Sequence, residues 1–264
     1  MSETPALMFA DGKAYERFMG RWSRLAGEKF LDWLDPPKNL RWIDVGCGNG
    51  AFTELLIARC SPAAVTGIDP SEGQLAYART RPGARMAQFR LADAQDLPFD
   101  DRSFDAASMA LVISFVAEAE KAVAEMARVV KPGGWIATYM WDIPAGGLPV
   151  QPIYAALEAL GIEAPPRPGP QNSMRENMRA LWERAGLQSI DDRVIRIPVV
   201  YSDFEDFWET ANLPVGPTGK MIQEFSPSTR EQFRVRLREQ APIGADGHIA
   251  FEAFANAVKG RAPG

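Results

Sequence analysis

The residues best suited to chemistry lie where a short apolar run meets three alternating glycines. Residues 42–50 read Trp-Ile-Asp-Val-Gly-Cys-Gly-Asn-Gly, and a stretch of helical character follows. Glycines at a strand end let bare backbone approach a ligand, and the N–H groups that begin the next helix favour a nucleotide-like ligand. The pattern predicts that Gly46, Gly48 and Gly50 form a ligand-binding turn.

Acidic residues at successive strand ends narrow the choice of ligand. Asp69 and Pro70 end the next strand-like run, and Asp69 lies 23 positions after Gly46. This separation is close to the roughly 20 residues expected before the carboxylate that holds ribose hydroxyls in such βαβ units. Asp44 precedes the turn, where a carboxylate suits a cationic ligand better than a pyrophosphate. A third strand-like run ends near Asp93, which adds an acidic loop at the same sheet edge.

The glycine pattern also fits a dinucleotide-binding enzyme. Gly46, Gly48 and Ala51 satisfy G-x-G-x-x-G/A, so an NAD(P)-dependent oxidoreductase is the alternative hypothesis. Short-chain dehydrogenases need Tyr-x-x-x-Lys, and none of the five tyrosines is followed four positions later by lysine. The surrounding residues therefore favour a cationic ligand.

One further segment completes a set of four motifs. Residues 125–134, Glu-Met-Ala-Arg-Val-Val-Lys-Pro-Gly-Gly, end a helix and open another strand. With the motifs in this order, residues 38–142 resemble the core of a class I S-adenosylmethionine-dependent methyltransferase of the methyltransferase-11 type. The resemblance implies S-adenosylmethionine as cofactor and an α/β fold. That fold is a doubly wound, mostly parallel, seven-stranded Rossmann-like sheet with an N-terminal helical lid and helical cap insertions.

The resemblance also implies which residues hold the cofactor. It implies that Asp69 accepts hydrogen bonds from two ribose hydroxyls. It also implies that Asp93 accepts one from the adenine amino group, with Asp96 as the alternative residue for this role. Asp44 orients the glycine turn or the cofactor's ammonium group rather than acting as a base. The other expected cofactor contacts are Gly46, Gly48, Gly50, Pro70 and the backbone N–H of Ala94.

The N-terminal segment resembles the lid of some bacterial members of this family. Residues 12–34 predict one or two helices interrupted near Gly20. Tyr15, Arg21 and Ser23 are candidates for binding the carboxylate end of the cofactor, for which a guanidinium is the natural partner. We expect this segment to close over the ligand and exclude water.

Aromatic residues with few cations suggest the wall of a substrate pocket. Phe115, Trp141, Phe204 and Trp208 are the candidates, although an aromatic stripe is more often core. The loop after the fourth predicted strand reads Ser-Phe-Val at 114–116, not the Asn/Asp-Pro-Pro-Tyr of many amide and exocyclic-amine methylases. The sequence therefore predicts methyl transfer to a small organic acceptor at an oxygen or carbon centre.

A general base is not indicated by any motif. Methyl transfer rests largely on positioning and desolvation, but a hydroxyl acceptor usually needs a base. Asp142, after the fifth predicted strand, and His248, the sole histidine, are the candidates. A module that binds S-adenosylmethionine without turnover is a further alternative.

Apolar strands alternate with amphipathic helices, which predicts a parallel sheet with ligands at the carboxyl ends of its strands. In the core, strands are expected at 40–45, 63–68, 85–91, 104–111 and 135–141, and helices at 50–60, 71–80 and 117–130. Beyond it we expect helices at 153–160, 174–185, 203–208 and 227–239, strands at 188–200 and 248–257, and a loop at 213–219. We interpret 1–264 as one domain, with a lid (1–37), a cofactor-binding core (38–142), and cap insertions plus the last two strands (143–264).

The composition limits the kinds of partner that we expect this protein to bind. The 264 residues carry a net charge of −5, which disfavours nucleic acid because phosphate binding needs a basic surface. The longest apolar stretch is too short to cross a bilayer, and residues 1–11 lack a secretory leader pattern, so we expect a cytoplasmic protein with no membrane partner. Cys47 and Cys60 are not expected to pair, and no metal site is expected. The sequence leaves monomer and homodimer open.

Overall fold

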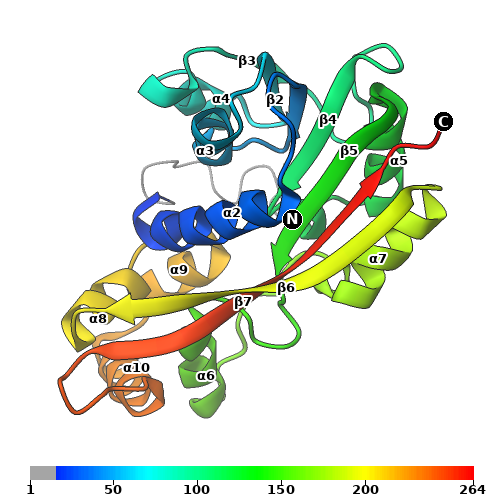
Figure 1. The fold of residues 1–264 in the computed structure, drawn as a ribbon. Helices are drawn as coiled ribbons and strands as arrows, with labels where there is room; N and C mark the ends of the chain where they lie inside the picture. The colour runs from blue at the N-terminus through cyan, green and yellow to red at the C-terminus, as the bar shows by residue number, and fades with distance from the viewer. Residues whose placement is uncertain (1–15) are drawn as a thin grey trace.

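The computed structural model describes residues 16–264, and a seven-stranded sheet lies at its centre (Figure 1). The strand order is β3-β2-β1-β4-β5-β7-β6. Strand β7 runs antiparallel to both of its neighbours, β5 and β6, whereas the other strand pairs in residues 16–264 are parallel. The predicted fold class is confirmed. The strands are β1 (Arg41–Val45), β2 (Ala64–Asp69), β3 (Ala87–Leu91), β4 (Phe104–Ala110), β5 (Val130–Trp141), β6 (Gln188–Tyr201) and β7 (Ile249–Arg261).

Helices flank the sheet and cover one of its ends (Figure 1). They are α2 (Arg21–Leu34), α3 (Ala51–Cys60), α4 (Glu72–Ala78), α5 (Ala119–Val129), α6 (Gln151–Ala159), α7 (Arg175–Arg184), α8 (Phe204–Ala211), α9 (Gly216–Gln223) and α10 (Pro227–Gln240). Shorter turns are the π-helix η2 (Glu16–Gly20) and the 3-10 helices η3 (Pro82–Ala84), η4 (Ile113–Phe115) and η5 (Pro170–Ser173). None of the helices in residues 16–264 has the length and apolar character needed to cross a membrane.

The alternation of side chains along β1 divides the buried apolar residues between two clusters. Trp42 packs in one cluster with Phe30 of α2, whereas Ile43 packs in the other with Val123 of α5. Successive residues of a strand point to opposite faces, so the sheet is buried on both sides. This burial explains why the central strands read as nearly continuous apolar runs.

Two elements differ from the expectations. Strand β5 begins at Val130, five residues before the expected start, because the register shifts after its first pair and the following residues bulge. The loop expected at 213–219 is wrong, since α9 begins within it. Pro217 stands in the first helical turn, where its missing N–H costs no hydrogen bond. A Cβ on Gly219 would collide with the carbonyl oxygen of Leu213, so packing requires this glycine.

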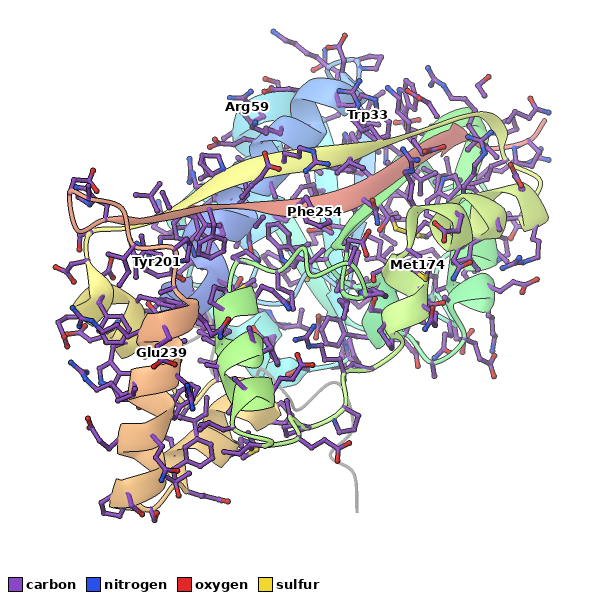
Figure 2. All side chains as sticks on the ribbon, turned by 90° about the horizontal axis from the view of Figure 1, so that it is seen from below. Trp33, Arg59, Met174, Tyr201, Glu239 and Phe254 are labelled. Carbon is purple, nitrogen blue, oxygen red and sulfur yellow. The ribbon has the colours of Figure 1, made fainter. Side chains whose placement is uncertain are left out.

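Strands β6 and β7 form a long antiparallel hairpin that carries part of the cap. Tyr201 pairs with Ile249 at one end, and Gln188 pairs with Arg261 at the other. Residues 202–248 are inserted at the first end and contain α8, α9 and α10. Helix α10 packs beside α6, as Figure 2 shows from below. The cap therefore gathers at one end of the hairpin, below the N-terminal helix α2 in Figure 1.

The N-terminal segment is helical as predicted, but the predicted interruption near Gly20 is only a change of helix type, because Gly20 keeps helical dihedrals (φ −55°, ψ −45°). The π-helix η2 ends at this residue, and α2 begins at the next one. A Cβ on Gly20 would lie 2.8 Å from Cδ of Glu16. Helix α2 packs against α3 and β6, so it spans from the glycine turn to the hairpin. Tyr15, one of the predicted cofactor residues, lies outside the described residues.

Candidate active site

The glycine turn between β1 and α3 is held against β2. The N–H groups of Gly46 and Cys47 both donate to the carbonyl oxygen of Ile68, each at 2.8 Å. Gly46 has a φ of 73°, and a Cβ there would lie 2.6 Å from Cγ1 of Val112. Gly48 has a φ of 51°, but no atom lies within 4 Å of the position of its missing Cβ. The turn thus needs a glycine at position 46 for packing, while Gly48 leaves room for a ligand.

Asp69 lies beside this opening, at the carboxyl end of β2. Its Oδ2 accepts a hydrogen bond from the N–H of Gly48, and its Oδ1 accepts one from the N–H of Ser71, both at 2.9 Å. Burial raises the pKa of this carboxyl, while the two N–H donors lower it. A carboxylate has about four acceptor positions, so Asp69 can still accept hydroxyls from a ligand.

Asp44 is fully buried just before the glycine turn and does not line the cavity described below. Thr53 of α3 donates to its Oδ2 at 2.6 Å, and Ser108 of β4 donates to its Oδ1 at 3.4 Å. Burial raises the pKa of Asp44 to about 6, although both hydroxyls lower it. These bonds attach the start of α3 to the end of β1, which orients the turn.

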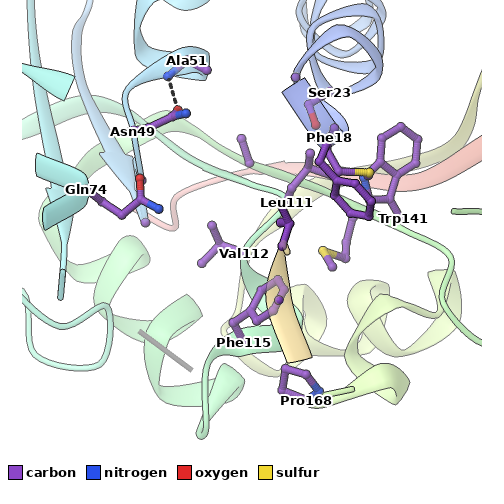
Figure 3. A pocket seen from close by; sticks show the side chains of 18 of the residues that line it. Phe18, Ser23, Asn49, Ala51, Gln74, Leu111, Val112, Phe115, Trp141 and Pro168 are labelled. Atoms are coloured by element: carbon purple, nitrogen blue, oxygen red, sulfur yellow. Dashed lines mark hydrogen bonds between the residues drawn. The ribbon is translucent and has the colours of Figure 1, made fainter. Parts of the chain in front are cut away.

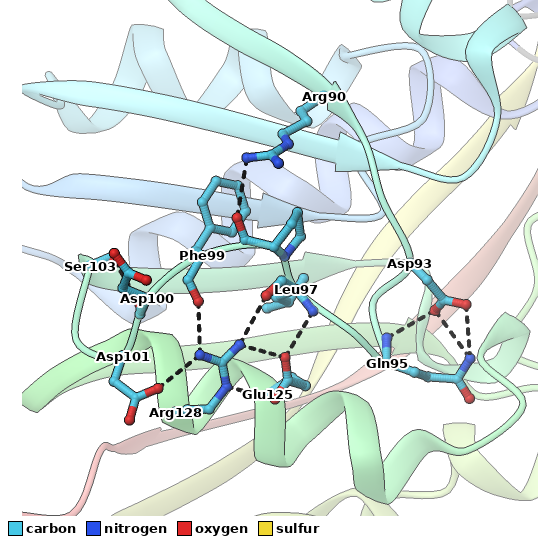
Figure 4. Close-up of polar contacts among 11 residues, drawn as sticks. Arg90, Asp93, Gln95, Leu97, Phe99, Asp100, Asp101, Ser103, Glu125 and Arg128 are labelled. Carbon is cyan, nitrogen blue, oxygen red and sulfur yellow. Dashed lines mark hydrogen bonds and ion pairs between the residues drawn. The ribbon is translucent and has the colours of Figure 1, made fainter.

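The loop after β3 that carries Asp93 is attached to α5 by Arg128 (Figure 4). The Arg128 guanidinium donates to two carbonyl oxygens of this loop, at 2.8 and 2.9 Å. Asp93 accepts hydrogen bonds from the backbone and side-chain N–H groups of Gln95, at 2.9 and 3.1 Å. Asp93 and Ala94 line the cavity, whereas Asp96 does not. The geometry therefore favours Asp93 over its rival.

Arg81, which follows α4, joins the glycine turn to the N-terminal segment. Its Nε donates to the carbonyl oxygen of Asn49 at 2.6 Å. Its Nη1 lies 3.0 Å from Glu54, and its Nη2 lies 2.6 Å from Glu16. One largely buried guanidinium thus holds η2, the turn and α3 together. Sequence reasoning missed Arg81, because its partners lie in other elements and no local motif marks it.

The glycine turn, Asp69, Asp93 and Arg81 line one cavity of about 580 Å³, a size typical of small-molecule sites. It extends from the glycine turn to the cap, where α6, α9 and residues 165–168 complete its wall. Figure 3 shows Asn49 and Gln74 on one side, and Ser23 and Trp141 on the other. The predicted site residues that line it are Ser23, Gly46, Gly48, Asp69, Pro70, Asp93, Ala94, Phe115 and Trp141.

The cap wall contains polar groups that the sequence did not indicate. The guanidinium carbon of Arg167 lies 3.6 Å from the centre of the Tyr154 ring. The hydroxyl of Tyr154 lies 3.5 Å from Oγ1 of Thr218 on α9. The indole Nε1 of buried Trp141 has no hydrogen-bond partner within residues 16–264. The cavity therefore offers a cation in a mainly apolar surrounding.

Besides Asp44, two other predicted cofactor residues lie outside the cavity wall. The Arg21 guanidinium lies 4.5 Å from the centre of the Tyr201 ring and 3.8 Å from Asp206, on the cap side of α2. Residues two positions apart on a helix point about 200° apart, so Arg21 turns away although Ser23 lines the cavity. Gly50 packs against α4, where a Cβ would lie 2.9 Å from the Ala78 side chain.

Two of the aromatic candidates belong to the packed interior of the cap and not to the pocket. Phe204 and Trp208 lie one turn apart on α8, and neither lines the cavity. Arg234 of α10 covers both rings at 5.2 and 4.9 Å. A stripe at this spacing faces one side of a helix, and here that side meets α10.

Neither predicted base reaches the cavity. Asp142 accepts hydrogen bonds from Asn256 at 2.8 Å and from the N–H of Ala145 at 3.2 Å. His248 is exposed in the turn before β7, where its backbone N–H donates to Oδ1 of Asp246 at 3.1 Å. Neither side chain lines the cavity, so neither is placed to take a proton from a molecule bound there.

Comparison with known proteins assigns the family. Residues 43–138 match a family model described as a methyltransferase domain. The chain is also 31% identical to a trans-aconitate 2-methyltransferase of an Acidovorax strain, over 91% of this chain and 93% of that protein. The chain belongs to the class I S-adenosylmethionine-dependent methyltransferases. This methyltransferase therefore uses S-adenosylmethionine, and the oxidoreductase alternative is rejected.

Other relatives match over less of their length, and solved structures match the fold. The methyltransferase is 35% identical to the O-methyltransferase cnsE of Penicillium expansum, over 62% of this chain and 57% of that protein. This chain spans about half the length of several other relatives that it matches. The YcgJ protein of Bacillus subtilis has a TM-score of 0.59 at 18% identity, covering 90% of this chain and 98% of that one. A Haemonchus contortus phosphoethanolamine N-methyltransferase 2 complex with S-adenosyl-L-methionine has a TM-score of 0.58 at 18% identity, covering 95% and 56%.

Proposed function

We propose that this methyltransferase acts on an oxygen atom of a small, largely apolar acceptor that is already ionised when it binds. The observation that carries the proposal concerns the carboxylates of the cavity. Within residues 16–264, every carboxylate that lines the cavity already accepts hydrogen bonds from the protein. An acceptor that had to lose a proton would need an available base. An anion needs none.

The arrangement of each carboxylate supports this reading. Glu16 and Glu54 both form ion pairs with Arg81, at 2.6 and 3.0 Å. Asp69 accepts hydrogen bonds from two backbone N–H groups, and Asp93 accepts one from the backbone N–H of Gln95. Burial raises the pKa of the Cys47 thiol well above its usual range, so the thiol stays protonated and is not a base.

The glycine end of the cavity suits the cofactor. The open space beside Gly48 lets a ligand approach bare backbone, and Asp69 keeps acceptor positions for ribose hydroxyls. Asp93 and the backbone N–H of Ala94 offer an acceptor and a donor to the edge of an adenine ring. S-adenosylmethionine supplies, when bound, a methyl group on a positively charged sulfur.

The rest of the cavity suits an acceptor with an apolar body. Phe18, Phe115 and Trp141 line it and exclude water. An oxygen anion that loses its hydration there interacts more strongly with a cationic methyl donor.

The names of relatives add support. Three of them refer to trans-aconitate, to malonyl-[acyl-carrier protein] and to a fatty acid, and each of these compounds carries a carboxylate. The latter two relatives are named O-methyltransferases. A carboxylate is ionised at neutral pH, so it meets the requirement set by the cavity.

A methyl-transfer assay tests the proposal. The protein would be incubated with S-adenosylmethionine tritiated on its methyl group and with separate pools of carboxylic acids, phenols, amines, nucleic acids and proteins. We expect label in the acid pool that alkali releases as methanol, because alkali hydrolyses methyl esters. A phenol ether, which would keep its label in alkali, would overturn the proposal that the acceptor is already ionised, because a phenol is protonated at neutral pH. Label found only on nitrogen, only on carbon or only in macromolecules would overturn the proposal.

A further inference from the structure

We infer that Arg167 binds a carboxylate group of the acceptor and thereby selects acids over neutral molecules of the same shape. The inference rests on the function proposed above and assigns a specificity-determining residue to it. Arg167 lies in the cap wall of the cavity, within the sequence Pro-Pro-Arg-Pro-Gly-Pro at 165–170. Its partners and its surroundings both point to an anionic ligand.

Among residues 16–264, Arg167 is the cavity arginine that has no carboxylate partner. Arg81 is paired with two glutamates, and Arg24 is paired with Glu28 at 3.1 Å. Within residues 16–264, no carboxylate oxygen lies within 4 Å of the Arg167 guanidinium. A half-buried cation in an apolar wall is unfavourable until an anion pairs with it. The acceptor carboxylate supplies that anion.

The Tyr154 ring holds the guanidinium in place. The guanidinium carbon lies 3.6 Å from the ring centre, well within the distance of a cation–π contact. Contact through the face leaves the N–H groups at the edge of the guanidinium available for a carboxylate, which they can bind in bidentate fashion. Thr218 lies 3.5 Å from the Tyr154 hydroxyl, so the ring is itself attached to α9.

The backbone around Arg167 is restricted before any ligand binds. Proline fixes φ, and Pro165, Pro166 and Pro168 all lie within two residues of Arg167. Gly169 has a φ of 42°, and a Cβ there would lie 2.6 Å from the carbonyl oxygen of Ser114. The segment therefore packs closely on η4, and Figure 3 shows Pro168 next to Phe115. A restricted backbone reduces the entropy lost when a ligand binds.

Binding of matched acids and amides tests the inference independently of turnover. Octanoate, octanamide, trans-cinnamate and trans-cinnamamide would be titrated calorimetrically into the protein saturated with S-adenosylhomocysteine. We expect the acids to bind at least tenfold more tightly than their amides, because an amide leaves the Arg167 cation unpaired. Equal affinity of acid and amide, or no binding of either acid, would overturn the inference.

Three variants then assign the effect to one side chain. Arg167→Gln should abolish the preference for acids over amides, whereas Arg167→Lys, which keeps the charge, should retain part of it. Arg236→Gln is the matched control, because Arg236 lies on α10, pairs with Glu239 and does not line the cavity. An acid preference that survives in Arg167→Gln would overturn the inference. The proposed function is tested separately, because label found only on nitrogen or only on carbon in the transfer assay would overturn it.

Discussion

Nη2 of Arg81 lies 2.6 Å from Oε2 of Glu16, and this contact joins the N-terminal helical segment to the glycine turn. The same guanidinium binds the carbonyl oxygen of Asn49 within the turn. Order in the turn and the position of η2 at the cavity wall are therefore linked through one side chain. A ligand that orders the turn should also order the segment above it.

Glu16→Gln tests this link. The substitution removes one charge from the pair and leaves the contacts of Arg81 with Glu54 and Asn49 intact. The Glu16 side chain is 42% exposed, so solvent screening limits the loss to about 1 kcal/mol or less. Hydrogen exchange in residues 16–24 should become up to about fivefold faster without ligand.

Mass spectrometry with and without S-adenosylhomocysteine provides the measurement. Glu28→Gln is the control, because it breaks the pair with Arg24 on α2 and leaves Arg81 untouched. In the unmodified protein, exchange in residues 16–24 should slow when the ligand is added. Identical exchange with and without ligand would show that this segment does not cover the site.

Asp69→Ala should weaken binding of S-adenosylhomocysteine by about 2–3 kcal/mol, because ribose hydroxyls lose a charged acceptor in a buried site. Calorimetry measures the change. Asp96→Ala is the matched control, since Asp96 is exposed and does not line the cavity. If both variants bound like the unmodified protein, Asp69 would serve only to hold the N–H groups of Gly48 and Ser71.

Gly48→Ala and Gly133→Ala form a pair that separates backbone strain from ligand contact. Both glycines have positive φ, 51° and 75°, and neither has an atom within 4 Å of an added Cβ. Each alanine should cost about 1–2 kcal/mol of unfolding free energy through its backbone conformation. Only the Gly48 variant should lose affinity for S-adenosylhomocysteine, by tenfold or more, because only Gly48 lines the cavity. Equal affinities in the two variants would contradict a ligand beside Gly48.

Asp44 should make stability depend on pH. Its folded pKa of about 6 lies above its ordinary value of 3.8, so the folded state keeps a proton that the unfolded state releases. The resulting stabilisation is complete below the ordinary value and is lost as pH rises through the folded pKa. Relative to Asp44→Asn, the unmodified protein should lose up to about 3 kcal/mol of unfolding free energy between about pH 4 and 7.

Urea denaturation at several pH values measures this difference. Asp100→Asn is the control, because Asp100 is exposed and its stability curve should parallel that of the unmodified protein. Parallel curves for Asp44→Asn as well would show that Asp44 titrates normally in the folded state.

Local patterns were sufficient to predict the alternation of strands and helices in the core, and the positions of Gly46, Gly48 and Asp69 in the cavity wall. Apolar runs bounded by turn residues marked the strands within a few residues, except at the bulged start of β5. The Gly46 to Asp69 spacing placed both residues at neighbouring strand ends, because parallel pairing of β1 and β2 brings those ends together. Sequence periodicity carries this information directly.

The acceptor end could not be predicted in the same way. Arg81 and Arg167 act through residues from other elements, and no spacing within one segment reveals such contacts. Trp141 and Trp208 look equivalent in the sequence, yet only Trp141 lines the cavity. Which face of α8 is covered depends on the packing of α10, which periodicity within α8 does not contain.

The pairing of Tyr201 with Ile249 has an evolutionary consequence. Residues 202–248 leave and re-enter the hairpin at adjacent positions, so insertions, deletions or recombination within them need not disturb the register of β6 and β7. Because α9 from this insertion forms part of the cavity wall, such events would alter which acceptor fits while the glycine turn stays the same. Acceptor preference can therefore diverge among descendants of this gene without loss of the methyl donor.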